Sequence, residues 1–577
     1  MTGTLKETKK WYRRKRFWLV VILVLLVYFC FVPSRLRISP ETTGITEPLT
    51  ADGRVDYFAA FEETYIDKLS PPEDNGQRLI IAAIGPRVLE QPFLADSVGA
   101  WENMQTHEDS KKWFNNYWIP LCEHLYIDPY KKPMFYEKLS FHSYMYKYLK
   151  EQKKAAGEND NKKITDTETD PEKLYKKLTA GIWKKEDHPG VGKWLDDYSE
   201  VLDYFGMCVR KPNFACWRIH PPDGNLTAII LPDVQATREF ARSLNIRICE
   251  RLGRGDIDGA WHDIMTMKYL ARHLVNGETL VTNLVGISIS YTAANATKLL
   301  LIHCRPNEKQ LAKFISDLNT LPKYDPLVSS LNIERLVLLQ AITSCKNKKY
   351  FESLFDGMDT NNAHTWMLKL ILRFPFDANI AGKHLTKIYK EFDLQDKKHI
   401  ASNPVFRRKY GEQHEKIIQK YHDKFNLDEM KFMKQFYRMP LIRTRSELFA
   451  ECIFSYWAPA ISSAFIAFDR YEALNEMQRL AINLERYKLA NGKYPDKLDD
   501  LVPKYIDIVP IDPCTGRSTF VYKLNAPAKE TIDAKQIAET KTPEPPNLNY
   551  ILYSLGPNRK DDNGTQLGKS KDFDIVF

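Results

Sequence analysis

The clearest candidates for catalysis lie close together on one predicted helical hairpin. His262 and Asp263 are adjacent, and Asp258 lies about one helical turn before them. An imidazole beside a carboxylate is a common pairing for general acid–base catalysis. A solvated polar face of a helix explains the same residues without any reaction, and we favour that interpretation.

The same hairpin contains Asp256-Ile-Asp258, which has the spacing of a metal-binding DxD motif. The triplet falls in a turn between helices, and no α/β alternation predicts a nucleotide-sugar fold. His414 lacks the second histidine of a zinc-protease helix, and Gly382-Lys383 lacks the rest of a phosphate-binding loop. The chain has no Gly-x-Ser-x-Gly elbow. These motifs indicate no particular enzyme class.

Cysteine chemistry gives one further candidate. Cys208 and Cys216 are eight residues apart in an irregular segment and are the best disulfide pair among the nine cysteines of the chain. An odd count leaves at least one cysteine unpaired. Buried free thiols are the alternative for this pair.

The hairpin itself is predicted by apolar stripes at helical spacing. The first stripe comprises Phe240, Leu244, Ile248 and Leu252, and the second comprises Ile257, Trp261, Ile264, Met267 and Leu270. The turn between them contains two glycines, and Asp256 is the expected N-cap of the second helix. Similar patterns predict helices over 306–321, 326–345, 379–392 and 412–437. We therefore expect an all-α body over 55–445.

A different pattern begins near residue 474. Leu474, Met477, Ala481, Leu484 and Tyr487 lie on one face of an amphipathic helix. Asn491-Gly492 supplies a left-handed cap that ends it. Two aromatic and β-branched runs, 520–522 and 550–553, predict two strands of a small antiparallel sheet packed on the helix.

This terminal region resembles the globular domain of the major pseudopilin of type II secretion systems. The motifs are NLERYKLANGKYPDKLDDLVPKYIDIVPIDPCTGRSTFVYKL, then YILYSLGPNRKDDNG and a closing DFDIVF. The family has the same order of long helix, Tyr-Pro, Leu-Val-Pro-x-Tyr turn, Asp-Pro-x-x-Gly loop and final hairpin. The resemblance covers the last hundred or so residues, and the remainder resembles uncharacterised bacterial membrane-anchored helical proteins. It implies a small pilin-like α+β domain over 446–577.

The resemblance also implies a calcium-binding loop. Its candidate ligands are the backbone of Leu555 and the side chains of Asn558, Asp572 and Asp574, with Asp561 and Asp562 as additional carboxylates. Calcium takes six to eight oxygen ligands, which such a set can supply. Asn558 departs from the family because it replaces an expected carboxylate. A solvated acidic chain end is the alternative, and the spacing does not fit an EF-hand.

The other end of the chain predicts a membrane anchor. Residues 17–32 are uninterruptedly apolar and would rise about 24 Å as a helix, slightly less than the roughly 30 Å hydrocarbon core. Seven basic residues between Lys6 and Arg16 keep the first segment, 1–16, cytoplasmic by the positive-inside rule. No small-residue cleavage site follows, so we expect an uncleaved signal anchor in the inner membrane, a linker over 33–54 and an exported body. A cleaved signal peptide would lead to the same compartment.

The charge distribution agrees with this division. Residues 1–37 hold nine Lys or Arg and one acidic residue, which gives +8 of the total net charge of +9. The rest of the chain carries a net charge of only +1, which disfavours a body that binds nucleic acid. The stretches 280–304 and 449–468 are predicted as buried helices and not as membrane spans. Residues 155–171 and 526–549 are predicted to be disordered or flexible.

Two hypotheses follow. The first is a single-pass bacterial envelope protein with a helical scaffold and a pseudopilin-like terminal domain, which binds envelope or secretion-system proteins and is not a polymerising pilin. No pilin processing signal adjoins either the anchor or the terminal domain. The alternative is an anchored periplasmic or lumenal enzyme such as a glycosyltransferase.

Overall fold

The computed structural model describes residues 17–22, 33–69, 71–86, 111, 114–136, 138, 140–155, 171–215, 218, 224–226, 232–323, 328–344, 376–391, 412–413, 415–417, 419–421, 442–524, 549–564 and 575–577. The protein is mostly helical, as predicted. The predicted loops at 155–171 and 526–549 lie, apart from their ends, outside the described residues.

Short helices form the first part of the body. These are α2 (Tyr57–Glu62), η1 (Ile66–Leu69), η2 (Pro72–Asp74), α3 (Gly76–Ile84), the π-helical turn η4 (Phe114–Trp118), α7 (Ile119–His124), α8 (Phe141–Ala155), α9 (Pro171–Thr179) and α10 (Pro189–Cys208). Aromatic side chains hold them together: Phe141, for example, packs edge-on against Trp194 with ring centroids 5.3 Å apart. Aromatic pairs of this kind prefer edge-to-face contacts.

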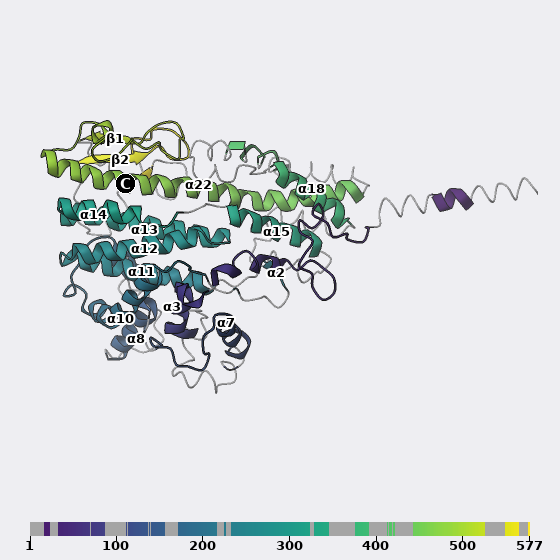
Figure 1. Ribbon diagram of the computed structural model, residues 1–577, viewed down its shortest axis with the longest axis horizontal. Coiled ribbons are helices and arrows are strands. Elements are labelled where there is room, and N and C mark those ends of the chain that lie inside the picture. Colours follow the sequence, from purple (N-terminus) through teal and green to yellow (C-terminus); the bar gives the residue numbers. More distant parts are fainter. Residues whose placement is uncertain are drawn as a thin grey trace, which may run out of the picture.

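Further helices follow and lie side by side (Figure 1). They are α11 (Pro232–Gly253), α12 (Ile257–Val275), α13 (Leu280–Cys304), α14 (Glu308–Asn319), α15 (Val328–Ser344), α18 (Ala378–Glu391) and α22 (Ile442–Asn491). α12 packs between α11 and α13, and α13 packs against α22. The predicted hairpin is therefore confirmed, and so are the helices predicted over 306–321, 326–345 and 379–392.

α22 is a 50-residue helix, about 75 Å long at 1.5 Å per residue. It continues through Pro459 and joins the apolar stretch 449–468 to the terminal amphipathic helix. Most of its buried apolar residues belong to the same core as the body, since α13, α14, α15 and α18 all pack on it, whereas those from Ile461 to Tyr471 form a second cluster with Val275 and Leu280. It ends at Asn491, where Gly492 has a φ of 74° and acts as the predicted cap.

The C-terminal sheet packs on the second half of α22. β1 (Val521–Leu524) pairs antiparallel with β2 (Tyr550–Ser554), as predicted, and β2 also pairs antiparallel with β3 (Ile575–Val576). The order is β1-β2-β3, and β2 and β3 contact α22. A short 3₁₀ turn, η6 (Leu498–Leu501), follows the helix as expected. The closing residues of the chain thus supply a strand that the sequence pattern does not reveal.

Two apolar segments bear on the membrane. Within the described part of the chain, α13 is the one helix long and apolar enough to span a bilayer, but 56% of its apolar window is buried inside the protein. It packs between α12 and α22, which agrees with the prediction of a buried helix. Of the predicted anchor, only 17–22 is described. These residues form a helical turn apart from the body, with Phe17 63% exposed (Figure 1).

Candidate functional site

The turn between α11 and α12 is organised by Asp256. Gly255 adopts a φ of 81°, which permits the tight reversal. Asp256 then caps α12, since its Oδ1 accepts a hydrogen bond of 3.0 Å from the Gly259 amide. The N-cap assignment is confirmed. The cap fixes the start of the helix that carries His262 and Asp263.

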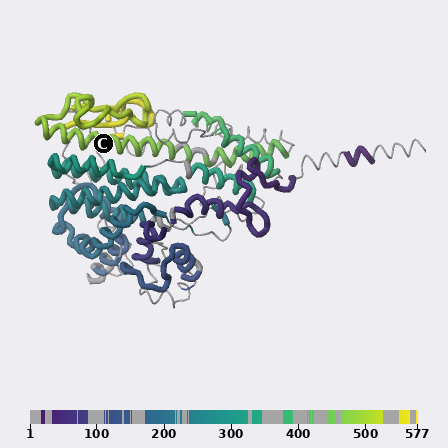
Figure 2. Tube along the Cα trace, viewed as in Figure 1, coloured from purple at the N-terminus to yellow at the C-terminus, as the bar shows by residue number. Residues whose placement is uncertain are grey.

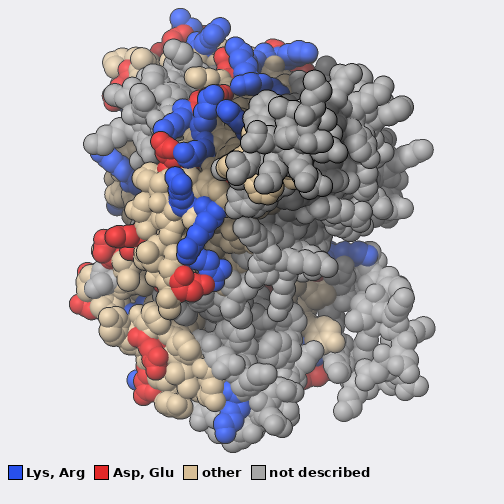
Figure 3. All heavy atoms as spheres, turned by 90° about the vertical axis from the view of Figure 1, so that its right-hand side faces the viewer, with Lys and Arg blue, Asp and Glu red and all other residues tan. Residues whose placement is uncertain are grey.

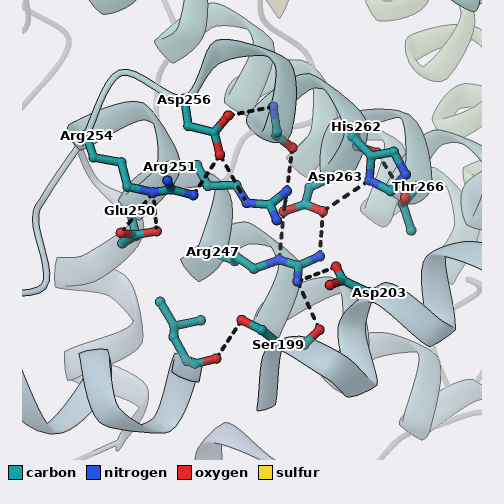
Figure 4. A network of polar contacts seen from close by, with 12 residues as sticks. Ser199, Asp203, Arg247, Glu250, Arg251, Arg254, Asp256, His262, Asp263 and Thr266 are labelled. Carbon is teal, nitrogen blue, oxygen red and sulfur yellow. Dashed lines mark hydrogen bonds and ion pairs between the residues drawn. The ribbon is translucent and has the colours of Figure 1, made fainter. Parts of the chain in front are cut away.

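Asp263 is fully buried and lies at the centre of an ion network (Figure 4). The Arg247 guanidinium donates to both of its oxygens, at 2.9 and 2.7 Å, and Arg251 Nη1 lies 3.1 Å away. Burial alone would raise the pKa of Asp263, but the charges of Arg247 and Arg251, together with the neighbouring His262 side chain, outweigh it and lower the pKa. The carboxylate is therefore held ionised.

The network extends to a third helix. Arg247 Nη1 also donates to Asp203 at 2.8 Å and to the Ser199 carbonyl at 3.1 Å, both on α10. Only 3% of the Arg247 side chain is exposed. A buried charge that lost one of these partners would destabilise the protein strongly. The network therefore locks α10, α11 and α12 together.

The structure separates the three predicted catalytic residues. The Nδ1 atom of His262 lies 3.7 Å from Asp263, and the imidazole is about half exposed. Asp258 turns toward α14, where the Gln310 amide donates to it at 3.2 Å. His262 and Asp258 face a groove of about 630 Å³ between α12 and α14. Asp263 instead forms ion pairs with Arg247 and Arg251. This arrangement fits a solvated polar face better than a general acid–base pair.

The two carboxylates of the DxD triplet also contact different partners. Asp256 faces Arg254 at 2.6 Å and Arg251 at 3.7 Å, while Asp258 contacts α14. A cation between the two carboxylates would have to displace a guanidinium. Across the part of the chain that is described, no cluster of three or more His, Cys, Asp or Glu side chains forms a metal site. The geometry therefore gives glycosyl transfer no support.

A second polar cluster lies inside the core. Lys268 Nζ is 3.2 Å from Ser290 Oγ and 2.7 Å from the amide oxygen of Asn475, which joins α12, α13 and α22. Burial, with the nearby charges of Arg272 and Arg479, lowers the pKa of Lys268 well below its usual value. A lysine beside a serine can activate a nucleophile. Both side chains are closed to solvent, so a substrate could not reach them.

The C-terminal loop is organised by Asp512, which the sequence had placed only in a turn. Its Oδ1 accepts from the Cys514 amide and the Ser554 hydroxyl, both at 2.9 Å, and its Oδ2 accepts from the Leu555 amide at 3.2 Å. The Asp-Pro-x-x-Gly turn is thereby fixed to the end of β2. Burial outweighs these donors and raises the pKa of Asp512.

The predicted calcium ligands lie just beyond this turn. Asp561 accepts from the Tyr553 hydroxyl at 2.7 Å and faces Lys523 at 3.6 Å. Asp562 accepts from the Asn558 amide at 2.8 Å. Asp572 and Asp574 lie outside the described residues. The described candidates are thus held by protein donors and make no calcium shell by themselves.

The predicted disulfide pair, like the predicted calcium ligands, is only partly within the described residues. Cys208 is buried, and burial raises the pKa of its thiol to about 12. Cys216 lies outside the described residues. The pairing of these two cysteines stays a prediction.

A further link between segments that are distant in sequence lies at the start of α18. The Ser34 amide donates to Asp377 Oδ2 at 2.7 Å, and the Asn379 side chain accepts from the Arg37 amide at 2.7 Å and donates to the Arg35 carbonyl at 3.0 Å. Asp377 Oδ1 caps α18 through the Asn379 amide at 2.8 Å. We call residues 34–43 the tether. Its contacts with α18 were not predicted, although an aspartate just before a helical pattern is an N-cap signal.

Gly382 shows how closely the tether is packed on α18. A Cβ atom at this position would lie 2.0 Å from the carbonyl oxygen of Thr42. No larger residue fits without a shift of the backbone. The Gly382-Lys383 pair, considered above as a fragment of a phosphate loop, is thus a contact site for the tether.

No protein-family model, curated protein or solved structure matches this chain. Any functional assignment therefore depends on the geometry described above and on the sequence motifs.

Proposed function

We propose that this chain is a single-pass, membrane-anchored bacterial envelope protein whose helical body is a rigid scaffold for partner proteins. The body holds a pseudopilin-like α+β end away from the inner membrane. The observation that carries this proposal is the docking of the tether on α18, because it connects the anchor to the body without a flexible linker.

The connection begins in the N-terminal segment, which is drawn in purple in Figure 2. Ser34 is two residues beyond the apolar run, so it lies at most about 7 Å from the end of the anchor. Ser34 binds Asp377, and the Asp377 amide donates to the buried Ser446 hydroxyl at 2.7 Å. Ser446 lies in the first turns of α22. The anchor is therefore fastened to the start of the longest helix.

α22 then determines how far the C-terminal sheet lies from the docking point of the tether. The second half of α22, on which the C-terminal sheet packs, lies roughly 30 to 70 Å along the helix from Ser446. Its first half is covered by α15 and α18, which leaves it unavailable as the packing helix of a filament. This supports a scaffold and disfavours a polymerising pilin. The tether, residues 34–43, is a docked part of the predicted linker over 33–54.

The membrane part of the proposal is tested by extraction and topology in bacterial cells. The full chain should stay in the membrane pellet after alkaline carbonate treatment, and its body should become protease-accessible in spheroplasts. A variant with Leu25→Arg and Leu26→Arg should be released. Release of the unmodified chain by carbonate, or protection of its body in spheroplasts, would contradict the proposal.

The partners are tested by crosslinking in native membranes followed by mass spectrometry. A scaffold should give reproducible crosslinks from the body or the terminal sheet to other envelope proteins, including secretion-system proteins. Crosslinks confined to copies of this chain would contradict the partner-binding part of the proposal.

We also propose that calcium stabilises the terminal loop, with Asp572 and Asp574 completing a shell beside Asn558, Asp561, Asp562 and the Leu555 backbone. At calcium concentrations about fivefold above the Kd, binding would add about 1 kcal/mol to the free energy of unfolding. EDTA should therefore lower the melting temperature of the full chain slightly, and Asp572→Ala with Asp574→Ala should abolish that shift. An EDTA-insensitive melt with no calcium uptake by calorimetry would exclude the site.

A further inference from the structure

α18 presents a stripe of basic side chains to solvent. Lys383, Lys387 and Lys390 are all exposed and follow Asn379 by four, eight and eleven residues. At 100° per residue these positions share one face of the helix. Asn379 is the residue that holds the tether, so the stripe begins where the tether docks.

The tether adds two further basic side chains. Arg35 and Arg37 are both exposed, and their backbone groups make the docking contacts with Asn379. We call these two residues and the three lysines the basic collar. The acidic residues that accompany it are Asp377, which accepts from Ser34, Glu41, 3.3 Å from Lys383, and Glu391, which ends α18 and faces Lys420 at 3.4 Å. Five basic groups against these three carboxylates leave the collar with a net charge of +2.

The position of the collar follows from the anchor and therefore rests on the function proposed above. Arg35 and Arg37 are three and five residues beyond the apolar run. Lys383 lies one helical turn from Asn379, which is hydrogen-bonded to the backbone of both arginines. Figure 3 faces the end of the molecule from which the N-terminal segment leaves, and it shows Lys and Arg side chains gathered in a band there.

We propose that the basic collar binds the anionic phospholipid headgroups of the leaflet from which the body emerges. A basic side chain within about a Debye length of an anionic surface strengthens attachment roughly fivefold. Several such contacts beside a fixed anchor would hold the body in one orientation on the membrane. α22 would then project the terminal sheet in a defined direction, which a single tethered point does not achieve.

The test uses the full chain in two kinds of lipid nanodisc. One is made of phosphatidylcholine alone, and the other contains about one quarter phosphatidylglycerol. Lysine acylation by a water-soluble active ester, followed by mass spectrometry, reports the accessibility of each amine. Lys383, Lys387 and Lys390 should react about threefold more slowly in the anionic discs, most clearly at Lys383, and high salt should remove the difference.

Lysines at the far end of α22 provide an internal control. Lys493 and Lys497 are exposed beside the C-terminal sheet and should react equally in both lipids. The double variant Lys387→Gln with Lys390→Gln should reduce the protection of Lys383. The matched variant Lys493→Gln with Lys497→Gln should leave that protection unchanged.

The outcomes separate this inference from the function on which it rests. A chain that enters the discs but shows equal collar reactivity in both lipids overturns the lipid interaction and leaves the anchor intact. A chain that does not associate with the discs overturns the anchor, and the collar proposal with it. Protection that is equally strong in phosphatidylcholine discs and insensitive to salt would also overturn the electrostatic binding.

Discussion

Two regions that pack on α22, the tether with α18 near its start and the C-terminal domain on its second half, each depend on a buried aspartate, and the electrostatics of the two aspartates are opposite. At the start of the helix, Asp377 accepts hydrogen bonds from the Ser34 amide and hydroxyl and from the Asn379 and Ile380 amides. In the C-terminal domain that packs on the second half of α22, Asp512 accepts from the Cys514 and Leu555 amides and the Ser554 hydroxyl. Each carboxylate joins segments that are distant in sequence.

The pKa shifts of the two carboxyls differ in sign. Burial opposes ionisation of Asp377, but the donors from Ser34 and the α18 amides outweigh it and lower the pKa. At Asp512, which is fully buried, the loss of solvation outweighs three donors and raises the pKa. Asp377 has more hydrogen-bond donors and slightly more solvent exposure, so its ionised form is stabilised. Asp512 has fewer donors and no exposure, so its ionised form is not. The stability of the tether and α18 should therefore depend more on Asp377 than the stability of the C-terminal loop depends on Asp512.

The largest effect is expected from Asp377→Ala. It removes a helix cap and an ionised acceptor, so the free energy of unfolding should fall by about 4 kcal/mol. Urea denaturation of the full chain in detergent measures the loss, and hydrogen exchange should locate it in 34–43 and α18. Ser34→Ala, which leaves the cap in place, should cost about 1 kcal/mol. Equal losses in the two variants would contradict the double role of Asp377.

Asp512→Ala should be less damaging. It leaves three donors without their acceptor but also relieves the cost of a buried carboxylate, so we expect a loss of about 2 kcal/mol. Hydrogen exchange should increase over 511–519 and β2 while α18 stays protected. Increased exchange at both ends would instead show that α22 couples them into one cooperative unit.

Gly382→Ala sets two effects of opposite sign against each other. Alanine in the middle of α18 would favour the helix by about 1 kcal/mol. Its Cβ would clash with the Thr42 carbonyl, and overpacking of this kind costs about 2 kcal/mol. We expect net destabilisation of about 1 kcal/mol, measured by urea denaturation, with increased proteolysis of the tether. Gly181→Ala, where a Cβ meets nothing within 4 Å, is the matched control.

The pH dependence of the two sites should have opposite slopes. Asp377, with its lowered pKa, contributes stability above its ordinary value of 3.8, and that contribution is lost as pH falls through the lower folded value. Asp512, with its raised pKa, favours the folded state below 3.8 and loses this contribution as pH rises through the raised value. Each unit of pKa difference corresponds to about 1.4 kcal/mol.

Asparagine variants measure these slopes by urea denaturation between pH 7 and pH 3. The destabilisation caused by Asp377→Asn should shrink as the solution is acidified, because the wild-type carboxylate becomes protonated. The destabilisation caused by Asp512→Asn should instead be smallest at pH 7. If the destabilisation changed with pH in the same direction for both variants, the proposed electrostatic difference between Asp377 and Asp512 would be contradicted.

Much of the helical architecture was predictable from local pattern. Apolar spacing located the α11–α12 hairpin, and Asp256 capped α12 as expected because N-capping is a local interaction. The end of α22 at Asn491 and the pairing of β1 with β2 followed from a glycine and from β-branched runs. These features depend on residues within a few positions of one another.

The roles of the charged residues were not predictable in the same way. Asp258, His262 and Asp263 are close in sequence, yet the structure buries Asp263 among arginines and turns Asp258 toward α14. Arg247 lies within an apolar stripe, and that position was the one available signal of a buried ion network. Whether a charged side chain is solvated, paired or catalytic depends on the helices packed against it.

The amino-acid sequence alone determined the helical periods, the caps, the apolar run near the N-terminus and the motif order of the terminal block, because these reside in neighbouring residues. Only the tertiary structure decided that Ser34 meets Asp377 across 343 positions, that Gly382 lies under the Thr42 carbonyl and that one helix links both ends. Contacts of this range depend on how whole helices pack. No local pattern encodes the packing of surfaces that are brought together only by the folded chain.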